Sequence, residues 1–312
     1  MAIQSGGDRE PAVFISAGSH STEQAGVTAA VELIDELETE HQVYVVPTRD
    51  PIGMNGYDYA LSLGLGEEVR IESIEELDTI LRERGEVLWE EEDVILSLIG
   101  EYGFANHGML GRLGPEHAEA VEPLKGRRIF TVARKEGIDG AAPLERAYTL
   151  IVDPLGEVLH INRFHDTAWA PAEPRCTRQL MARIRPGISF DLHEHGGSGR
   201  FWLSARHQQD DEGEEWENQI AQQVIGAIGE TGVELAREDE VGSAFFTRSQ
   251  RGVYWLDAGV RGQGVNLMDF AARTYGLAFG TEMGMLGSFQ QRVRLGKLVV
   301  QTAVRGFEER YS

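Results

Sequence analysis

The chain has 312 residues and a formal net charge of −22, from 51 Asp and Glu against 29 Lys and Arg. This balance argues against a nucleic-acid partner, since such affinity rests mainly on Lys and Arg that neutralise phosphates, and against docking on anionic membranes. A single cysteine, Cys176, excludes an internal disulfide framework. With no apolar run long enough to span a bilayer, the sequence predicts an acidic cytoplasmic protein.

The N-terminal region predicts a strand, a loop, a helix and a second strand. Residues 12–15 form an apolar run of strand length. A polar loop then leads to Ser21, which we expect to cap the helix, with Gln24 completing a capping box. Residues 43–46 predict the next strand, which Pro47 stops. Two strands joined by a helix favour an α/β layer architecture.

The middle of the chain, from about residue 54 to 140, has a weaker pattern. Residues 71–84 and 115–124 have the spacing of acidic amphipathic helices. Residues 94–98 and 129–133 predict strands.

The last third of the chain returns to clear patterns of two buried strands, a short helix and two long amphipathic helices. The strands are expected over 187–192 and 276–281, the short helix over 267–274, and the long helices over 216–229 and 289–304. Asn266 is expected to cap the short helix. Because no stretch has the composition of a flexible linker, we predict a single domain over residues 1–312.

Polar side chains follow several of the predicted strands. His20 and Glu23 come after the first strand, His193 after the strand at 187–192, and Glu282 after the strand at 276–281. In open α/β sheets, ligands bind at the carboxyl ends of the strands. Two histidines and one carboxylate can bind a catalytic Zn²⁺, and a further carboxylate can move the proton of an attacking water. A carboxylate in a first helical turn is also favoured by the helix dipole alone, so the combination carries the prediction.

Four short segments resemble the zinc metallocarboxypeptidases, the carboxypeptidase A/B-like superfamily, and occur in that family's order. Residues 17–23 (AGSHSTE) resemble its first zinc motif, and residues 190–193 (FDLH) resemble the strand that carries its third ligand. Residues 161–164 (INRF) are similar to the segment that holds the substrate carboxylate. Residues 279–282 (FGTE) look like the strand end with the catalytic glutamate.

The resemblance implies a three-layer α/β/α fold with a central mixed, mostly parallel twisted sheet, interrupted by an insertion at about 54–140. It implies that one Zn²⁺ ion is held by the side chains of His20, Glu23 and His193. Glu282 would then be the general base and acid, and Asn162 with Arg163 would bind the substrate carboxylate, Arg163 through a bidentate fork.

Two further roles of the family have only approximate matches in this sequence. Arg146 is the nearest candidate by spacing for the arginine that polarises the scissile carbonyl. Tyr254 is a candidate for the tyrosine that closes over a peptide substrate.

The predicted activity is hydrolysis of an amide bond next to a free carboxylate, as in a metallocarboxypeptidase that removes C-terminal residues from peptides. The alternative is an N-acyl amino acid deacylase, because the motifs also resemble the succinylglutamate desuccinylase and aspartoacylase branch. A non-catalytic carboxylate-binding protein is a third reading. An amidohydrolase-type pair of His193 and His195 is a fourth, disfavoured because the pair lies late in the chain. The expected partner is a small peptide or N-acyl amino acid, with neither nucleic acid nor membrane.

Overall fold

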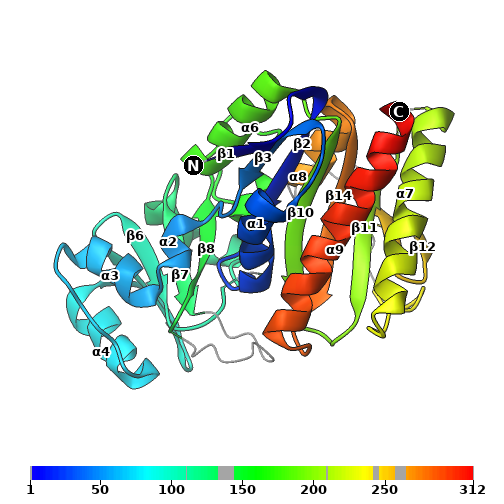
Figure 1. The fold of residues 1–312 in the computed structure, drawn as a ribbon. Coiled ribbons are helices and arrows are strands. Elements are labelled where there is room, and N and C mark those ends of the chain that lie inside the picture. Colours follow the sequence, from blue (N-terminus) through cyan, green and yellow to red (C-terminus); the bar gives the residue numbers. More distant parts are fainter. Residues whose placement is uncertain are drawn as a thin grey trace.

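Two β-sheets, each with its own helices, make up the frame of the molecule (Figure 1). The computed structural model describes residues 2–109, 111–132, 144–208, 210–241, 246–256 and 265–311. Within these ranges, no helix combines the length and the apolar character needed to cross a lipid bilayer.

The larger sheet contains eight of the described strands and is mixed in direction. In spatial order the strands are β1 (Ile3–Gly6), β3 (His41–Val46), β2 (Arg9–Ala17), β10 (Ile188–His195), β14 (Leu277–Gly284), β11 (Phe201–Arg206), β13 (Val253–Leu256) and β12 (Phe246–Gln250). The central run from β3 through β2 and β10 to β14 is parallel throughout. Towards the edges, β1, β11 and β12 each pair antiparallel with a neighbour. The parallel centre brings the carboxyl ends of β2, β10 and β14 together at one edge.

Helices pack on both faces of the larger sheet. On one face, α1 (Gln24–Glu36), α7 (Asp211–Glu230) and α9 (Phe289–Glu308) share an apolar core with the strands. On the other face lie α6 (Ala172–Ile184) and α8 (Leu267–Thr274). Successive residues of β2 pack into the two cores, Ile15 into the first and Phe14 into the second. The reason is that the side chains of a strand alternate between its faces.

The smaller sheet is built by the chain between β3 and α6, and its pairings are antiparallel apart from β6 with β7. Its strands are β4 (Glu86–Glu91), β5 (Val94–Ile99), β6 (Tyr102–Ala105), β7 (Arg128–Val132), β8 (Ala147–Val152) and β9 (Val158–His160). The helices α2 (Pro51–Met54), α3 (Tyr57–Leu65) and α4 (Ile74–Arg84) precede it, and α5 (Ala118–Val121) lies between the turns η1 (Pro115–His117) and η2 (Glu122–Leu124). Separate apolar clusters pack on its two faces.

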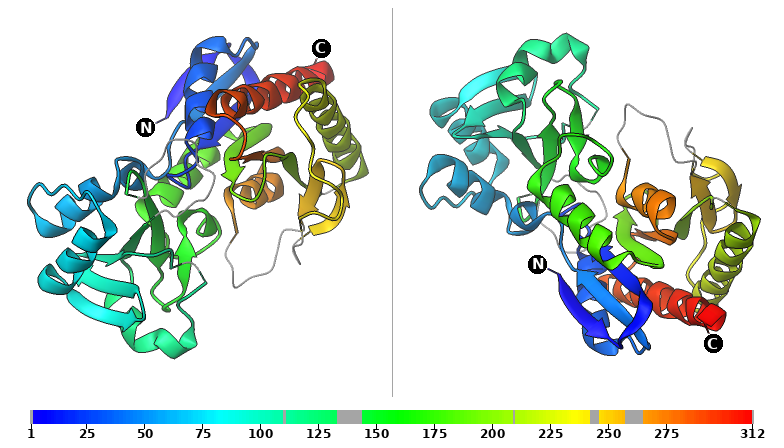
Figure 2. Two further views of the ribbon diagram at one scale, coloured as in Figure 1. Left: turned by 90° about the horizontal axis from the view of Figure 1, so that it is seen from below. Right: turned by 90° about the horizontal axis from the view of Figure 1, so that it is seen from above.

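Views from below and above show the two sheets as adjoining parts of the molecule (Figure 2). A short helical turn, η3 (Ile161–Arg163), follows β9, and a terminal turn, η4 (Glu309–Tyr311), follows α9. The smaller sheet therefore ends, in sequence, at the segment that carries Asn162 and Arg163.

The predicted mixed α/β class is confirmed, as are most of the predicted helices and strands. Asn266 does cap α8, since its side chain accepts from the backbone N–H of Asp269. The smaller sheet continues to residue 160, beyond the expected end of the insertion at about 140. The division of the chain into one domain with an insertion stays a prediction.

One helix cap predicted from the sequence is wrong. Helix α1 starts at Gln24, and no side chain caps it at the N-cap position, Glu23. Ser21 instead donates its hydroxyl proton to the carbonyl of Ala147 in the smaller sheet. The first helical amides, those of Ala25 and Gly26, donate to the carboxylate of Glu194 on β10, at 2.7 and 3.2 Å. A distant carboxylate thus supplies the acceptor that a local hydroxyl was expected to provide.

Candidate metal centre

The order of the central strands places His193 beside Glu282 and brings the loop that carries His20 to the same edge of the sheet. Strand β10 lies between β2 and β14, with Leu192 paired to Ala17 on one side and to Thr281 on the other. One position further, His193 is in register with Glu282. Because these strands are parallel, the loop after β2 leaves from the same edge of the sheet.

A left-handed glycine turns the chain at the end of β2 towards the site. Gly18 has a φ of 60°, and a Cβ atom there would lie 2.9 Å from a methyl group of Val27. Its carbonyl accepts the backbone N–H of Asp50, at 2.8 Å, which ties the turn to the loop after β3. The next turn is closed by a hydrogen bond from the Glu23 N–H to the His20 carbonyl, at 3.1 Å. These contacts bring the side chains of His20 and Glu23 to the end of β10.

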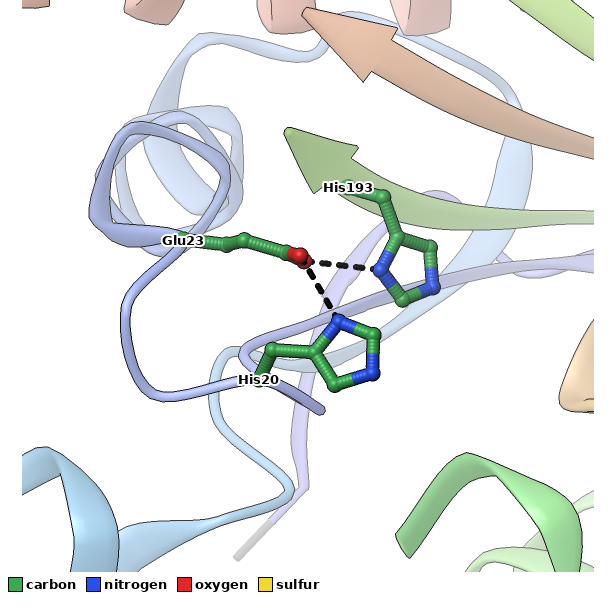
Figure 3. A group of neighbouring side chains, drawn as sticks. All are labelled: His20, Glu23 and His193. Carbon is green, nitrogen blue, oxygen red and sulfur yellow. Dashed lines mark hydrogen bonds and ion pairs between the residues drawn. The ribbon is translucent and has the colours of Figure 1, made fainter. Parts of the chain in front are cut away.

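The side chains of His20, Glu23 and His193 converge (Figure 3). The Nδ1 atom of His20 lies 2.7 Å from one Glu23 carboxylate oxygen, and the Nδ1 atom of His193 lies 2.7 Å from the other. One potential ligand atom from each residue lies within 4.8 Å of the others. Glu23 and His193 are buried, and His20 is partly buried.

This donor set fits a zinc ion. Two imidazole nitrogens and a carboxylate are a ligand set found in catalytic zinc sites, where a fourth position is left for water or substrate. Burial opposes protonation of His193, but the carboxylates of Asp191 and Glu23 outweigh it and raise the pKa of His193 well above its ordinary value. At 2.7 Å from Glu23, both Nδ1 atoms share protons with the carboxylate. A metal held by the same atoms would take the place of those protons.

Behind His193 lies a buried charged network. The Nε2 atom of His193 is 2.8 Å from an Asp191 carboxylate oxygen, to which Arg49 also donates, at 2.5 Å. Burial opposes ionisation of Asp191, yet Arg49 and His193 outweigh it and hold the pKa of the Asp191 carboxyl well below its usual value. The carboxylate therefore fixes the ring of His193, as metal-bound histidines generally require.

Asn162 belongs to the same network. Its amide oxygen accepts from Arg49 and from the backbone N–H of Leu267, both at 3.1 Å. Its amide nitrogen donates to Asp191, also at 3.1 Å. Asn162 lies at the cavity wall, but its amide atoms are already engaged by protein partners.

The smaller sheet supplies the surroundings of His20. The Nε2 atom of His20 lies 2.9 Å from the Nδ1 atom of His160, the last residue of β9. The ring of Tyr148, on β8, stacks on His20 with centroids 5.3 Å apart. Burial, followed by the neighbouring His20 and Arg163, holds the pKa of His160 well below its ordinary value.

A cavity of about 230 Å³ lies beside the three converging side chains. Two of the three, His20 and His193, line it together with Arg163 and Glu282. Its remaining wall is formed by polar and apolar side chains, namely His160, Asn162, Asp191, Trp202, Ser204, Arg206, Phe246, Leu256, Asn266 and Met268, and by Gly280.

The two arginines of the cavity differ in their partners. Arg206 is buried, forms an ion pair with Asp269 and donates to Asn266 at 3.3 Å. Arg163 is partly buried, and its guanidinium donates no hydrogen bond to any residue that the structure describes; burial lowers its pKa from the ordinary value. Arg163 is therefore the arginine whose donors are available to a bound anion.

Two predicted substrate-binding residues lie away from the cavity wall. Arg146 pairs with its neighbour Glu145, at 3.3 Å. Tyr254 is buried, donates its hydroxyl to the carbonyl of Arg237 and packs its ring against Trp202, with centroids 5.2 Å apart. Trp202, rather than Tyr254, faces the cavity.

Among the site residues that were not predicted from the sequence are Arg49, His160 and Arg206. Arg49 lies three residues after the predicted strand at 43–46, and Arg206 is the last residue of β11, a strand that the sequence did not predict. A position near a strand end was therefore an available signal for Arg49 alone. His160 stands two residues before the Asn-Arg pair, and nothing in its local pattern distinguishes it.

The comparisons with known proteins find similarity in structure and none in sequence. No family model matches the chain, and no curated protein matches it. The fold is similar to that of a presumptive metallopeptidase from Shewanella denitrificans OS217, with a TM-score of 0.53 and 13% sequence identity, over 97% of this chain and 77% of that chain. The resemblance inferred from the four motifs is thus confirmed at the level of fold.

Solved structures with lower TM-scores include both enzyme branches named above. A metallo-carboxypeptidase from Burkholderia cenocepacia has a TM-score of 0.48 and 10% identity, over 100% of this chain and 61% of that chain. A succinylglutamate desuccinylase/aspartoacylase from Rhodobacter sphaeroides has a TM-score of 0.44 and 14% identity, over 97% of this chain and 57% of that chain.

Proposed function

We propose that the protein is a zinc-dependent hydrolase that cleaves an amide bond next to a free carboxylate, and more specifically a metallocarboxypeptidase. One observation carries this proposal. His20, Glu23 and His193 converge beside a cavity that Glu282 and Arg163 also line. A Zn²⁺ ion held there would supply an activated water and Lewis-acid stabilisation of a developing oxyanion.

In this proposal, Glu282 moves the protons. This role is supported by its register position beside His193 and by its place in the wall of the same cavity. Glu282 takes a proton from the attacking water and returns one to the departing nitrogen, which is the work of a general base and acid.

Arg163 anchors the substrate carboxylate. Its planar guanidinium can donate two parallel hydrogen bonds to a carboxylate, and no residue in the described part of the chain accepts from these donors. We assign Asn162 to the support of Asp191 and Arg49, because its amide atoms are engaged there. Arg146 and Tyr254 are left out of the proposal because neither lines the cavity.

The alternative function, N-acyl amino acid deacylation, is favoured by the size of the cavity. Its volume of about 230 Å³ is below the roughly 300–1,000 Å³ of sites that take drug-sized ligands. A short substrate fits such a space, and an N-acyl amino acid is shorter than most peptides. We therefore propose a small peptide or an N-acyl amino acid as the partner, and no nucleic acid or membrane.

The proposal extends to the finer architecture. We propose a three-layer α/β/α arrangement with a mostly parallel central sheet, and a single domain in which the smaller sheet is an insertion.

The test is metal analysis of the purified protein, followed by assays on two substrates. We expect one zinc per chain, loss of activity on chelation and its return when zinc is added back. Hydrolysis of a blocked dipeptide would support the carboxypeptidase, and hydrolysis of an N-acyl amino acid alone would support the deacylase. Stoichiometric zinc without turnover of either substrate would favour the non-catalytic binder, and protein that takes up no zinc would contradict the proposal.

A further inference from the structure

The two proposed ligand histidines are held by unlike partners. Metal-bound histidines usually give their second N–H to a carboxylate, a backbone carbonyl or water. His193 follows this rule, with its Nε2 atom 2.8 Å from Asp191. His20 departs from it, because its Nε2 atom lies 2.9 Å from Nδ1 of another histidine, His160.

The chemistry of this contact specifies where the protons are. A histidine nitrogen that binds a metal carries no proton, so His20 bound through Nδ1 keeps its single proton on Nε2. That proton can be donated to His160 only if the Nδ1 atom of His160 is a bare acceptor. His160 must then be neutral and carry its own proton on Nε2.

We propose that His160 is a positioning residue, which holds the ring of His20 for the metal through a neutral acceptor instead of a carboxylate. This inference rests on the proposed zinc site. His160 is buried, with 9% of its surface exposed, and it ends β9 three residues before Arg163. One short segment therefore both orients a ligand and carries the carboxylate-binding arginine.

A neutral partner at this position suits a site that takes an anion. The negative charge of Asp191, behind the other histidine, is offset by Arg49 at 2.5 Å. His160 and Arg163 both line the cavity. Within the described part of the chain Arg163 forms no ion pair, although the charges of Asp269 and Glu282 act on its guanidinium. A carboxylate at residue 160 would add an uncompensated negative charge near a bound substrate carboxylate, and like charges in a partly buried site repel strongly.

The experiment compares zinc affinity among three variants at this residue. Metal-free protein is titrated with zinc against a chelator of known affinity, for the wild type and for His160→Leu, His160→Asn and His160→Asp. We expect His160→Leu to bind zinc about 10- to 100-fold more weakly, as is usual when the partner of a metal ligand is removed. His160→Asn keeps a neutral acceptor and should restore most of the affinity. His160→Asp should bind zinc more tightly than His160→Asn.

A second measurement addresses the charge. Binding of acetate to the cobalt-substituted protein, followed by its visible spectrum, should be weaker in His160→Asp than in His160→Asn. His41→Leu is the matched control, because His41 is also a buried histidine but contacts the backbone carbonyl of Pro11, at 2.7 Å, and no residue of the metal group. Its zinc affinity should equal that of the wild type. Thermal unfolding of the metal-free variants shows which of them are folded.

The outcomes separate this inference from the proposed function. If the wild type takes up no zinc, both are overturned. If the wild type binds zinc and a folded His160→Leu binds it equally well, only the role of His160 is overturned. Should His160→Leu not fold, the comparison of the other two variants decides, and equal zinc and acetate affinities for Asp and Asn would overturn the inference.

Discussion

The two sides of the candidate metal centre are built on different physical principles. On the side of the larger sheet, His193 is backed by Asp191 and Arg49, which are buried and charged. On the side of the smaller sheet, His20 is backed by Tyr148 and His160, which are aromatic and neutral.

Because of this difference, the two sheets contribute differently to the site. Buried charges need close partners, since removing one partner leaves the other charge uncompensated, so the larger sheet holds its ligand in a network that resists change. The smaller sheet contributes neutral rings and Arg163, whose guanidinium donors are not taken by the described residues. In the proposed function, the larger sheet would hold the metal and the smaller sheet would form the wall that contacts the substrate.

The largest expected effect comes from Glu282, the proposed proton-transferring residue on the larger sheet. Glu282→Gln removes the proposed general base, and such groups contribute roughly 10²- to 10⁴-fold to rates. We expect kcat/KM to fall by that factor on whichever substrate is established, while zinc content stays at the wild-type level. A variant with full activity would remove Glu282 from the catalytic role.

The next effect tests the charged network itself. Arg49→Met removes one of the two cations that hold Asp191 ionised, the other being His193, and breaking a buried ion pair costs about 3–5 kcal/mol. Urea unfolding of the metal-free protein measures the loss. The matched control is Arg128→Met, which breaks an ion pair between β7 of the smaller sheet and Glu173, at 2.7 Å, that is more exposed. Its cost should be smaller, because both of its side chains keep some contact with solvent. Equal losses in the two variants would contradict the difference between the two sides of the site.

A third prediction concerns a buried carboxylate on the larger sheet, Glu217. It accepts the indole N–H of Trp255, at 2.8 Å, and the backbone N–H of Arg206, at 3.0 Å. Burial raises the pKa of Glu217 from 4.5 to about 7, with these two hydrogen bonds opposing the rise.

The sign of its pH dependence follows from linkage. Between pH 4.5 and 7 the unfolded chain releases the Glu217 proton and the folded chain retains it, so this group makes folding less favourable as pH rises. Glu217→Gln removes the ionisable carboxyl group and, with it, this pH-dependent contribution to the free energy of unfolding. Over this range the stability of the variant should improve relative to the wild type, by up to about 3 kcal/mol. Urea unfolding at pH 4.5, 6 and 7.5 measures the difference, and a difference that does not vary with pH would contradict the assignment.

The smallest expected effect lies on the side of the smaller sheet. Arg163→Met should lower kcat/KM about 10- to 100-fold, since hydrogen bonds to charged groups are worth about 1.5–3 kcal/mol. Zinc affinity should not change. Arg146→Met is the control, because Arg146 does not line the cavity, and we expect it to retain nearly full activity. An equal loss of kcat/KM in both variants would indicate that Arg146 also takes part in substrate binding.

The residues of the metal group could be predicted because each lies close to a local signal. His20 and Glu23 stand in one loop after a strand, and His193 and Glu282 stand near the ends of apolar strands. The missed residues act over long separations. His160 is 140 positions from His20, and Arg49 is 142 positions from Asp191. No periodicity of the sequence reports such a contact.

By itself, the sequence determined which side chains could bind a metal and on which strands they sit, because the alternation of apolar residues and the polar strand ends are local properties. Only the tertiary structure decided which residue stands behind His20 and which arginine pairs with Asp191. The partner of a buried polar atom depends on which strands become neighbours, and the chain between β3 and α6 folds into a second sheet before it returns to the site. That path brings His160 to His20 and leaves Arg163 at the cavity wall.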